Sequence, residues 1–452
     1  MNGVTAKRGC LVAGLVLTLL ASSCGTGDPG SSLYPLSVSP NGRYLVDGRG
    51  DPFLVVGDAP QSLMINGSLA DARLLFANRV SHGINTVWIA LIGNDYDGGR
   101  ADATTFDGVA PFTTPGDLST PNEAYFARCD QVIQAASDEG LNVILNPAET
   151  GGFMAMLRAN GAAKCREYGR YVGSRYKNFD NIVWMSGTDF QTWRTDADNE
   201  IVKALAEGIR ERDTRHVQTL QLDYFVSSSL DDGLWAGLVT LNAAYTYYPA
   251  YAEVLKDYAH DPAVPVFVIE SDYELENGSD AERLRRQEYW TYLSGGCGYV
   301  FGHGFIWPLG LGWEDDLDSI GMVEFSHCAS LFRSLPWYSL VPDRAQSLVT
   351  AGYGTYWSGG TPSYGISQND YATAAATPDG TLALVYVPTA RTITVDMARL
   401  SGPVTGRWFD PTAGTYQTIG GSPFAASGPR TFTTPGVHAD GASDWVLRLD
   451  KE

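Results

Sequence analysis

Eight short apolar runs alternate with segments of helical periodicity between residues 53 and 345. Runs such as INTVWIALI, residues 84–92, are rich in Val, Ile and Trp, as strands buried on both faces are. The intervening segments, such as residues 123–140, carry apolar side chains at helical spacing and end at a glycine. Eight strand-helix units in succession predict a barrel of parallel strands. We therefore expect an α/β fold, a (β/α)8 TIM barrel, over residues 37–345.

The pattern changes after residue 345. Runs such as LALVYVP, residues 382–388, and GRWFDPTAG, residues 406–414, are separated by Asp-Gly, Pro and Gly turns. Short strands with such turns are typical of antiparallel sheets. We therefore expect a C-terminal antiparallel β-sandwich domain over residues 346–452. Asn-Gly and Asp-Gly turns also predict a hairpin lid ahead of the first barrel strand.

The first 23 residues have the pattern of an export signal. Two basic residues precede the apolar run at 11–21, which is too short to anchor the chain across a bilayer. Small residues immediately before Cys24 resemble a lipoprotein cleavage box, so we expect removal of residues 1–23 and lipidation of Cys24. Residues 24–36 then form a flexible tether. The protein is expected to be an outer-membrane or cell-surface lipoprotein, held to the membrane by the lipid anchor only, with a periplasmic or secreted protein as the alternative.

The formal net charge of −20 argues against nucleic acid as a partner, because phosphates attract basic patches. Aromatic residues are plentiful, with 11 Trp, 24 Tyr and 17 Phe, and aromatic faces pack against the C–H faces of sugar rings. Most of these rings nevertheless belong in a core of this size. Composition is therefore compatible with a glycan partner but does not require one.

Four cysteines follow the signal segment and Cys24: Cys129, Cys165, Cys297 and Cys328. An even number in an oxidising compartment is compatible with two disulfides, and pairing of sequence neighbours, 129 with 165 and 297 with 328, is the simplest arrangement. Buried free thiols are the equal alternative. Their spacing contains no CxxC pair, so we expect no zinc site, and no other motif implies a metal or a cofactor.

Two of the buried strands end in carboxylates. The run NIVWMSGTD closes on Asp189 at the end of the predicted fourth strand, and VPVFVIE closes on Glu270 at the end of the seventh. The carboxyl ends of barrel strands form the rim where such folds carry their active sites. Two carboxylates at one cleft fit glycoside hydrolysis, in which one protonates the leaving oxygen and the other attacks the anomeric carbon. Structural salt bridges at the rim are the alternative.

Other side chains at strand ends predict a sugar pocket around this pair: Asp58, Trp88, Asn146, Tyr245, Tyr247, Tyr273, His303 and Trp307. Three of them have a plainer interpretation. Asp58 could cap the following helix, His303 could be a satisfied loop histidine, and Trp307 could pack at the rim. The segment NDYDGG, residues 94–99, lacks the remaining oxygen ligands of a calcium loop and is expected to be a solvated loop.

Several stretches resemble the apiosidase-like glycoside hydrolase family over residues 37–345. They are YLVDGRGDPFLVVGDAPQSL at 44–63, NRVSHGINTVW, NIVWMSGTD, ESDYE at 270–274, and YWTYLSGGCGYVFGHGFIW at 289–307. The tail, with LALVYVP and WFDPTAG, is similar to the β domain that follows this catalytic domain and is labelled a collagen-binding domain of a collagenase. No HExxH motif accompanies that label, so nothing supports a metalloprotease.

The resemblance implies a retaining mechanism in which Asp189 is the acid/base and Glu270 the nucleophile. It also implies a furanose-like pentose, such as apiose, at the cleaved bond. One departure concerns Thr188, which stands where the family usually has a second glycine and where the wider group of barrel glycosidases has an Asn that holds the sugar 2-OH. Thr188 is therefore a further candidate for substrate contact, and substrate preference is the property that it puts in question.

These observations predict a retaining glycoside hydrolase that acts on a polysaccharide, at apiosyl or other pentofuranosyl residues, without a metal or cofactor. The competing hypothesis is a non-catalytic glycan-binding surface lipoprotein that keeps the barrel as a scaffold. A third hypothesis is that the C-terminal domain binds host matrix. It is based only on the label of that domain.

Overall fold

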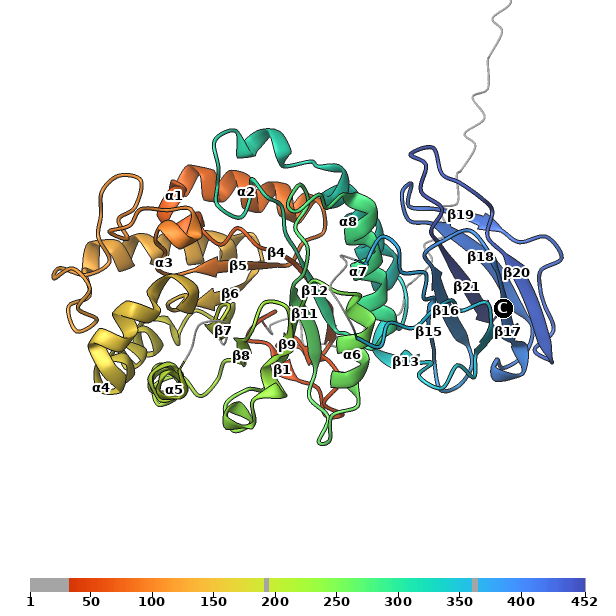
Figure 1. Cartoon of the computed structure of the whole chain (residues 1–452), viewed down its shortest axis with the longest axis horizontal. Coiled ribbons are helices and arrows are strands. Elements are labelled where there is room, and N and C mark those ends of the chain that lie inside the picture. Colours follow the sequence, from red (N-terminus) through yellow and green to blue (C-terminus); the bar gives the residue numbers. More distant parts are fainter. Residues whose placement is uncertain (1–31, 191–194, 360–364, 452) are drawn as a thin grey trace, which may run out of the picture.

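The computed structural model describes residues 32–190, 195–359 and 365–451. The predicted signal segment, Cys24 and most of the predicted tether lie outside these ranges. A barrel of alternating strands and helices carries a smaller β domain at its side (Figure 1). The barrel strands follow in chain order: β4 (Val55–Asp58), β5 (Thr86–Ala90), β6 (Asn142–Asn146), β7 (Ile182–Gly187), β8 (Gln218–Gln221), β10 (Asn242–Thr246), β11 (Val266–Glu270) and β12 (Gly298–Phe301).

These eight strands are parallel neighbours in the order β8-β7-β6-β5-β4-β12-β11-β10. The extra strand β9 (Val226–Ser228) pairs antiparallel with β10 and borders the opening between β10 and β8. There the backbone amides of Thr240 and Leu241 donate to the carbonyl of Gln218 at 2.9 and 3.3 Å. The barrel is therefore nearly closed, and the predicted (β/α)8 architecture is confirmed.

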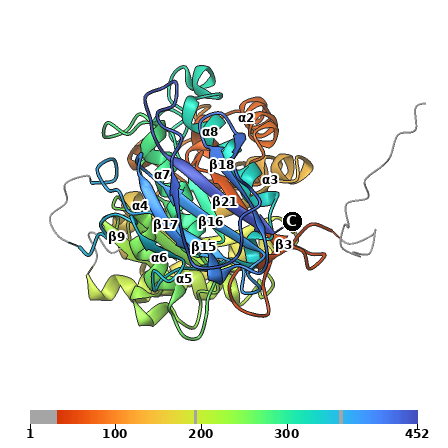
Figure 2. The same cartoon turned by 90° about the vertical axis from the view of Figure 1, so that its right-hand side faces the viewer.

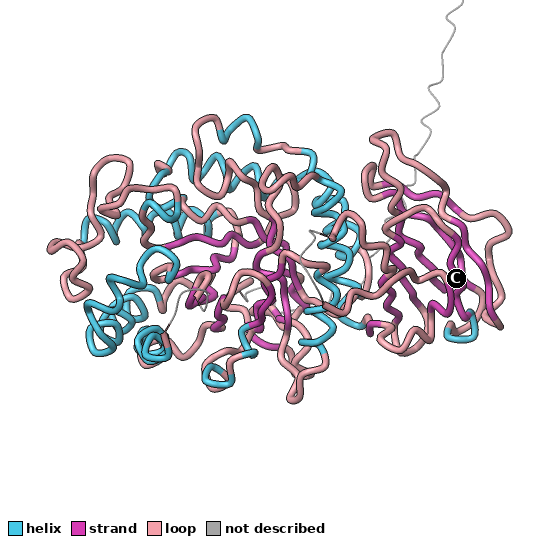
Figure 3. The backbone as a smooth tube through the Cα atoms, viewed as in Figure 1, coloured by secondary structure: helices cyan, strands magenta, loops and turns pink. Residues whose placement is uncertain are grey.

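Helices cover the outside of the barrel (Figure 3). They are α1 (Leu63–Asn66), α2 (Leu69–Ser81), α3 (Glu123–Asp138), α4 (Thr150–Tyr176), α5 (Asp196–Arg210), α6 (Ala250–Tyr258), α7 (Ala281–Leu293) and α8 (Ile320–Arg333). Helix α2 begins with a capping box. Ser68 Oγ accepts from the backbone amide of Asp71 at 3.1 Å, and Asp71 Oδ2 accepts from the backbone amide of Ser68 at 2.7 Å. Gly140, with φ +74°, takes the left-handed conformation just after α3.

Side chains of each strand alternate between two cores, because successive residues of a strand point to opposite faces. On β5, Val87 and Ile89 pack outward against the helices, whereas Trp88 lies in the barrel interior. The predicted hairpin lid covers the end of that interior at which the barrel strands begin. It is an antiparallel sheet of β1 (Ser37–Val38), β2 (Leu45–Val46) and β3 (Pro52–Phe53). The opposite end, where the strands finish, is left for a site.

The C-terminal domain consists of two antiparallel sheets around a shared apolar core (Figure 2). The larger sheet has the order β13 (Val341–Pro342), β15 (Thr373–Ala376), β16 (Leu382–Val387), β21 (Trp445–Lys451), β18 (Val404–Asp410) and β19 (Thr415–Thr418). The smaller has the order β14 (Val349–Ala351), β17 (Thr392–Asp396) and β20 (Pro429–Thr433). The predicted β-sandwich is confirmed, and its first paired strand already lies at residues 341 and 342.

One face of the larger sheet packs against α7 and α8 of the barrel. The rings of Tyr289 on α7 and Tyr386 on β16 are stacked with centroids 4.9 Å apart. Beside them, the buried guanidinium of Arg285 donates to Asp444 at 2.9 Å and to Glu324 at 2.5 Å. The second domain is therefore packed against the barrel through a buried interface.

The four cysteines of the described residues, Cys129, Cys165, Cys297 and Cys328, are buried free thiols. Of the two alternatives, buried free thiols are confirmed, and the pairing of sequence neighbours is wrong. Cys297 lies in the barrel interior and Cys328 in the core beneath the second domain, so these two belong to different packing layers, whereas Cys129 and Cys165 share the core beneath α3 and α4 and are still unpaired. Within the described residues, no helix is long and apolar enough to cross a bilayer.

Candidate active site

Asp189 and Glu270 lie at the ends of strands four and seven of the barrel, as predicted. Asp189 follows β7 by two residues, and Glu270 is the last residue of β11. Strand pairing places Gly187 opposite Gln221 and Tyr245 opposite Glu270. Both acids therefore come to the same rim, on either side of the opening between β8 and β10.

A shift in register directs Glu270 into this rim. Val266 and Val268 pack outward against the helices, and strict alternation would send Glu270 the same way. The pairing of β10 with β11 shifts between Ala244 and Tyr245, so that Tyr245 stands opposite Glu270 instead of Ile269. Such irregularities re-aim side chains and are common beside active sites. Glu270 consequently shares the inner side of the rim with Tyr245.

Gln221 connects the two acids. Its side-chain Oε1 accepts from the backbone amide of Asp189 at 3.3 Å, and its Nε2 donates to Oε2 of Glu270 at 2.7 Å. Gln221 is fully buried at the end of β8, so its amide is held in one orientation. A single side chain therefore fixes the position of one carboxylate and the backbone that carries the other.

Tyrosine hydroxyls surround the pair. Tyr247 donates to Oε1 of Glu270 at 3.3 Å, and its hydroxyl lies 3.2 Å from that of Tyr245. Tyr96, from the short helix η1 (Asp95–Asp97), donates to Oδ2 of Asp189. The rim thus offers hydroxyl donors to both carboxylates.

The backbone that presents Asp189 is held in an uncommon conformation. Gly187, Thr188 and Asp189 have φ values of +88°, +103° and +49°, in a region that favours glycine. The amide of Asn146 donates to the carbonyl of Gly187 at 3.0 Å and also to the hydroxyl of Thr188, while Thr150 Oγ1 donates to the carbonyl of Thr188 at 2.6 Å. Backbone strain of this kind is characteristic of functional sites.

Burial raises the pKa of both acids, and the charge of Asp189 raises the pKa of Glu270 further. Hydrogen bonds from Tyr96 and Tyr245 act in the opposite direction on the pKa of Asp189, as the bond from Gln221 does on that of Glu270. Two neighbouring carboxyls with raised pKa values hold one proton between them over a range of pH. This is the ionisation state that an acid and a nucleophile require together.

A second carboxyl pair lies behind the first. Asp97, on η1, and Glu149, three residues after β6, are almost completely buried, and Oδ2 of Asp97 accepts from the backbone amide of Asn94 at 2.9 Å. Burial raises the pKa of the Glu149 carboxyl well above its usual range, and Asp97 raises it further. Burial likewise raises the pKa of Asp97. The segment 94–99 exposes Asp95, Tyr96 and Gly98, as expected for a solvated loop, whereas Asn94 and Asp97 are buried and fix its course.

Several predicted sugar contacts have other partners. Asp58 is fully buried, and its Oδ2 accepts from Nε of Arg79 on α2 at 2.6 Å. His303 is also buried: its Nδ1 accepts from the amide of Phe305 at 3.2 Å, and its Nε2 lies 3.9 Å from Asp316. Neither contacts Glu270, so we leave Asp58 and His303 out of the proposed sugar contacts.

Four more of the predicted sugar contacts are Trp88, Asn146, Tyr273 and Trp307. Trp88 and Asn146 are fully buried, and Asn146 supports the backbone before Asp189. Tyr273 is buried and accepts from Gln61 at 2.6 Å. Trp307 is half-buried and donates from Nε1 to Glu276 at 2.5 Å.

Sequence reasoning overlooked four residues of this region: Gln221, Tyr96, Asp97 and Glu149. Glu149 closes the run of the third predicted strand, so the rule that selected Asp189 would have selected it also, whereas Gln221 is an amide inside the run of the fifth predicted strand, residues 216–223. Tyr96 and Asp97 carried no such signal, because they lie in a loop whose course depends on tertiary contacts.

One further cluster of carboxylates, Asp231, Glu253 and Asp257, has the spacing of cation ligands among the residues that the structure describes. Lys256 already supplies a positive charge there, with its Nζ 2.7 Å from Asp231 and paired with Glu253. We therefore assign no metal to it.

Residues 39–339 match the family described as "Apiosidase-like, catalytic domain", which is well over half of the chain. This chain belongs to the apiosidase-like family. Residues 364–450 match the family described as "Putative collagen-binding domain of a collagenase". A search of curated protein sequences returns no match.

Solved structures share the whole architecture of this apiosidase-like protein. One, described as a glycoside hydrolase, has a TM-score of 0.78 at 21% identity and covers 92% of this chain and 97% of its own. A family 5 glycoside hydrolase from Bacteroides vulgatus has a TM-score of 0.79 at 20% identity, over 93% of this chain and 94% of its own. At these identities the likeness shows a common fold. Family membership and the rim of paired acids identify the apiosidase-like chain as a glycoside hydrolase, whose substrate is a carbohydrate.

Proposed function

We propose that Asp189 and Glu270 cleave glycosidic bonds by double displacement, with retention of configuration. The observation that supports this most directly is the Gln221 side chain, which joins the carboxylate of Glu270 to the backbone of Asp189. A retaining enzyme needs two carboxyls on one cleft with fixed mutual position, because the same pair acts in both steps.

In the first step, Asp189 donates its proton to the glycosidic oxygen while a carboxylate oxygen of Glu270 attacks the anomeric carbon. The bond to the leaving sugar breaks, and a glycosyl ester of Glu270 forms. In the second step, Asp189 removes a proton from water, the water oxygen attacks the anomeric carbon, and Glu270 leaves as a carboxylate. Both groups return to their starting protonation states.

The hydrogen bonds favour the proton on Asp189. Nε2 of Gln221 can only donate, and a donor at 2.7 Å stabilises an ionised Glu270. The hydroxyl of Tyr96 can donate to an ionised Asp189 or accept from a protonated one. The shortest hydrogen bond to Glu270 therefore stabilises its charge, whereas the Tyr96 hydroxyl suits both states of Asp189, as the acid/base role demands.

The proposed substrate is a polysaccharide with apiosyl or other pentofuranosyl residues, as membership of the apiosidase-like family suggests. The proposed location is the outer membrane or cell surface, with Cys24 lipidated, or the periplasm or medium if the protein is released. Replacement of Cys24 by alanine should move the protein from the membrane fraction to the soluble fraction, and retention in the membrane would contradict the anchor.

The test of the mechanism uses Glu270→Gln and Asp189→Ala, with Glu139→Gln as a matched control at an exposed carboxylate of the opposite end of the barrel. Glycans with pentofuranosyl residues are incubated with each protein, and the anomer first released is identified by NMR. The wild type should give the retained anomer, and E270Q should give no product.

Asp189→Ala should still form the glycosyl ester from a dinitrophenyl glycoside, whose leaving group needs no proton, but should fail on a natural glycoside. Inversion by the wild type, or unimpaired cleavage by E270Q, would overturn the assignment.

A further inference from the structure

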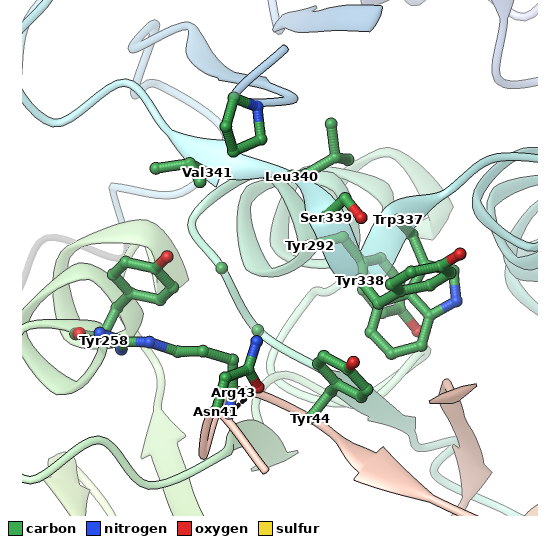
Figure 4. A pocket seen from close by; sticks show the side chains of 13 residues that line it. Asn41, Arg43, Tyr44, Tyr258, Tyr292, Trp337, Tyr338, Ser339, Leu340 and Val341 are labelled. Carbon is green, nitrogen blue, oxygen red and sulfur yellow. Dashed lines mark hydrogen bonds between the residues drawn. The ribbon is translucent and has the colours of Figure 1, made fainter. Parts of the chain in front are cut away.

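An aromatic pocket lies at the end of the barrel opposite to Asp189 and Glu270. It is bounded by the N-terminal hairpin, the ends of α6 and α7, and the segment that leads from η5 (Trp337–Ser339) into β13 (Figure 4). Its cavity measures ≈ 350 Å³, within the range of about 300–1,000 Å³ that is usual for small-molecule sites. The catalytic acids are not among its lining residues, so the rim and this pocket are separate sites.

Aromatic rings form its walls. Tyr44 packs edge-on against Trp337 with centroids 5.9 Å apart and lies 5.7 Å from the ring of Tyr338, which is 41% exposed. Tyr258 stands on the other side, with the guanidinium of Arg43 4.0 Å above its ring (Figure 4). Aromatic faces with polar tips are the surfaces on which the C–H faces of sugar rings pack.

The polar tips of these rings are free for a ligand. Across the described residues, no protein hydrogen bond engages the hydroxyls of Tyr44, Tyr258 and Tyr338 or the indole N–H of Trp337. The neighbouring Tyr292 differs, because its hydroxyl donates to the carbonyl of Val55 at 3.2 Å. Several uncommitted hydroxyls around one cavity match the alternating donors and acceptors of a sugar.

The charge of the pocket is opposite to that of the protein. Arg43 is its one charged lining residue, in a chain with a formal net charge of −20. One N–H of Arg43 donates to the carbonyl of Tyr258 at 2.5 Å, and the guanidinium forms no ion pair with any residue that the structure describes. A cation without a carboxylate partner favours an anionic group on the ligand.

Glycine at position 295 is required for this shape. Gly295 has φ +95°, and a Cβ there would lie 2.3 Å from Cδ2 of Tyr258. Any side chain would displace the ring that forms one wall. The backbone between α7 and β12 is thus adapted to hold Tyr258 against Arg43.

We propose that this pocket is a second, non-catalytic glycan site, which holds a uronate-bearing stretch of a polysaccharide. The sugar rings stack on Tyr44 and Tyr338, and the carboxylate of a uronic acid pairs with Arg43. Because the pocket and the catalytic rim are at opposite ends of the barrel, the site retains the enzyme on a polymer and does not position the bond that is cleaved. The choice of a glycan as ligand depends on the glycoside hydrolase family, whereas the site itself is independent of the roles of Asp189 and Glu270.

The test is native gel electrophoresis of the full chain carrying Glu270→Gln, which should not degrade the gel, in gels with polygalacturonate or a neutral galactan. Tyr338→Ala removes an exposed ring, and Tyr416→Ala is the control, because Tyr416 is also 41% exposed but lies on the C-terminal domain. Arg43→Gln tests the charge, with the melting temperature of each variant recorded.

Polygalacturonate should retard the parent protein, and Y338A and R43Q should each lower the apparent affinity at least about fivefold, whereas Y416A should not change it. Equal retardation of Y338A and Y416A, or no retardation of the parent, would overturn the site. Retardation by neutral galactan alone would overturn the acidic ligand. Product formation by the wild type is measured separately, so that failure of the catalytic assignment and failure of this site give different results.

Discussion

The side-chain amide of Gln221 donates from Nε2 to Oε2 of Glu270 at 2.7 Å. The same amide accepts from the backbone of Asp189 at 3.3 Å, so one neutral residue sets the position of both acids. It also affects the two acids differently, because its side-chain N–H stabilises the ionised form of Glu270, whereas the side chain of Asp189 is bonded to a hydroxyl. The glutamine at the end of the fifth barrel strand is therefore a positioning residue for the pair.

Replacement of Gln221 by glutamate should lower kcat by about 10²–10³-fold, the usual cost of losing a preorganised donor at a charged group. The new carboxylate also adds a like charge, which raises the pKa of Glu270. Since the proposed mechanism requires an ionised Glu270 for the attack, the acidic limb of the pH–rate profile should move to higher pH. The measurement is kcat/KM against pH, with Gln134→Glu on the exposed face of α3 as the matched control. An unchanged acidic limb would contradict this role.

Replacement of Tyr96 by phenylalanine should move the alkaline limb of the same profile. The hydrogen bond from Tyr96 lowers the pKa of Asp189 against the effect of burial, so its loss raises that pKa. Asp189 then keeps its proton to higher pH, and the alkaline limb moves upward by about 0.7 unit for a hydrogen bond of about 1 kcal/mol. Tyr416→Phe, on the second domain, should leave the profile unchanged. A shift to lower pH would refute the expected sign.

Replacement of Thr188 by glycine should not destabilise the protein. A non-glycine residue at φ +103° costs about 1–3 kcal/mol, which offsets the loss of the bond that Asn146 donates to the Thr188 hydroxyl. Thr188→Val keeps the strain and loses the acceptor, so it should be less stable than wild type by about 1–3 kcal/mol. Urea unfolding of both variants measures their free energies of unfolding. A glycine variant less stable than the valine variant would contradict the prediction.

Replacement of Glu288 by glutamine should flatten the pH dependence of stability. Glu288 on α7 is fully buried, neither carboxyl oxygen has a partner among the described residues, and burial raises its pKa well above the usual range. The folded state therefore binds the proton more tightly than the unfolded state. Its stabilising contribution is complete below the unfolded pKa of about 4.3 and decreases by about 1.4 kcal/mol per pH unit up to the folded pKa.

The glutamine variant lacks this titration. Its free energy of unfolding relative to wild type should therefore rise between pH 5 and pH 8, as measured in urea, whereas Glu139→Gln at an exposed position should show no such trend. A constant difference across this range would mean that Glu288 does not titrate with folding.

The barrel, the second domain and the strand ends that carry Asp189 and Glu270 were predictable from the sequence. Strand and helix periodicity are local properties, and a carboxylate at the end of an apolar run is visible without any tertiary contact. The same reasoning placed Asp58 and His303 at strand ends correctly. It could not show that Asp58 pairs with Arg79, because the partner comes from a helix 21 residues later in the chain.

Which way a strand-end side chain points was decided by the tertiary structure alone. By simple alternation Glu270 would face the helices with Val268, and the register shift between β10 and β11 turns it to the rim instead. Asp189 reaches the rim through three successive residues with positive φ, which contacts from other strands and helices hold in place. The sequence determined that two acids stand at the ends of strands four and seven. Long-range strand pairing and packing decided that both side chains point to the same rim, because only such contacts can stabilise an irregular backbone.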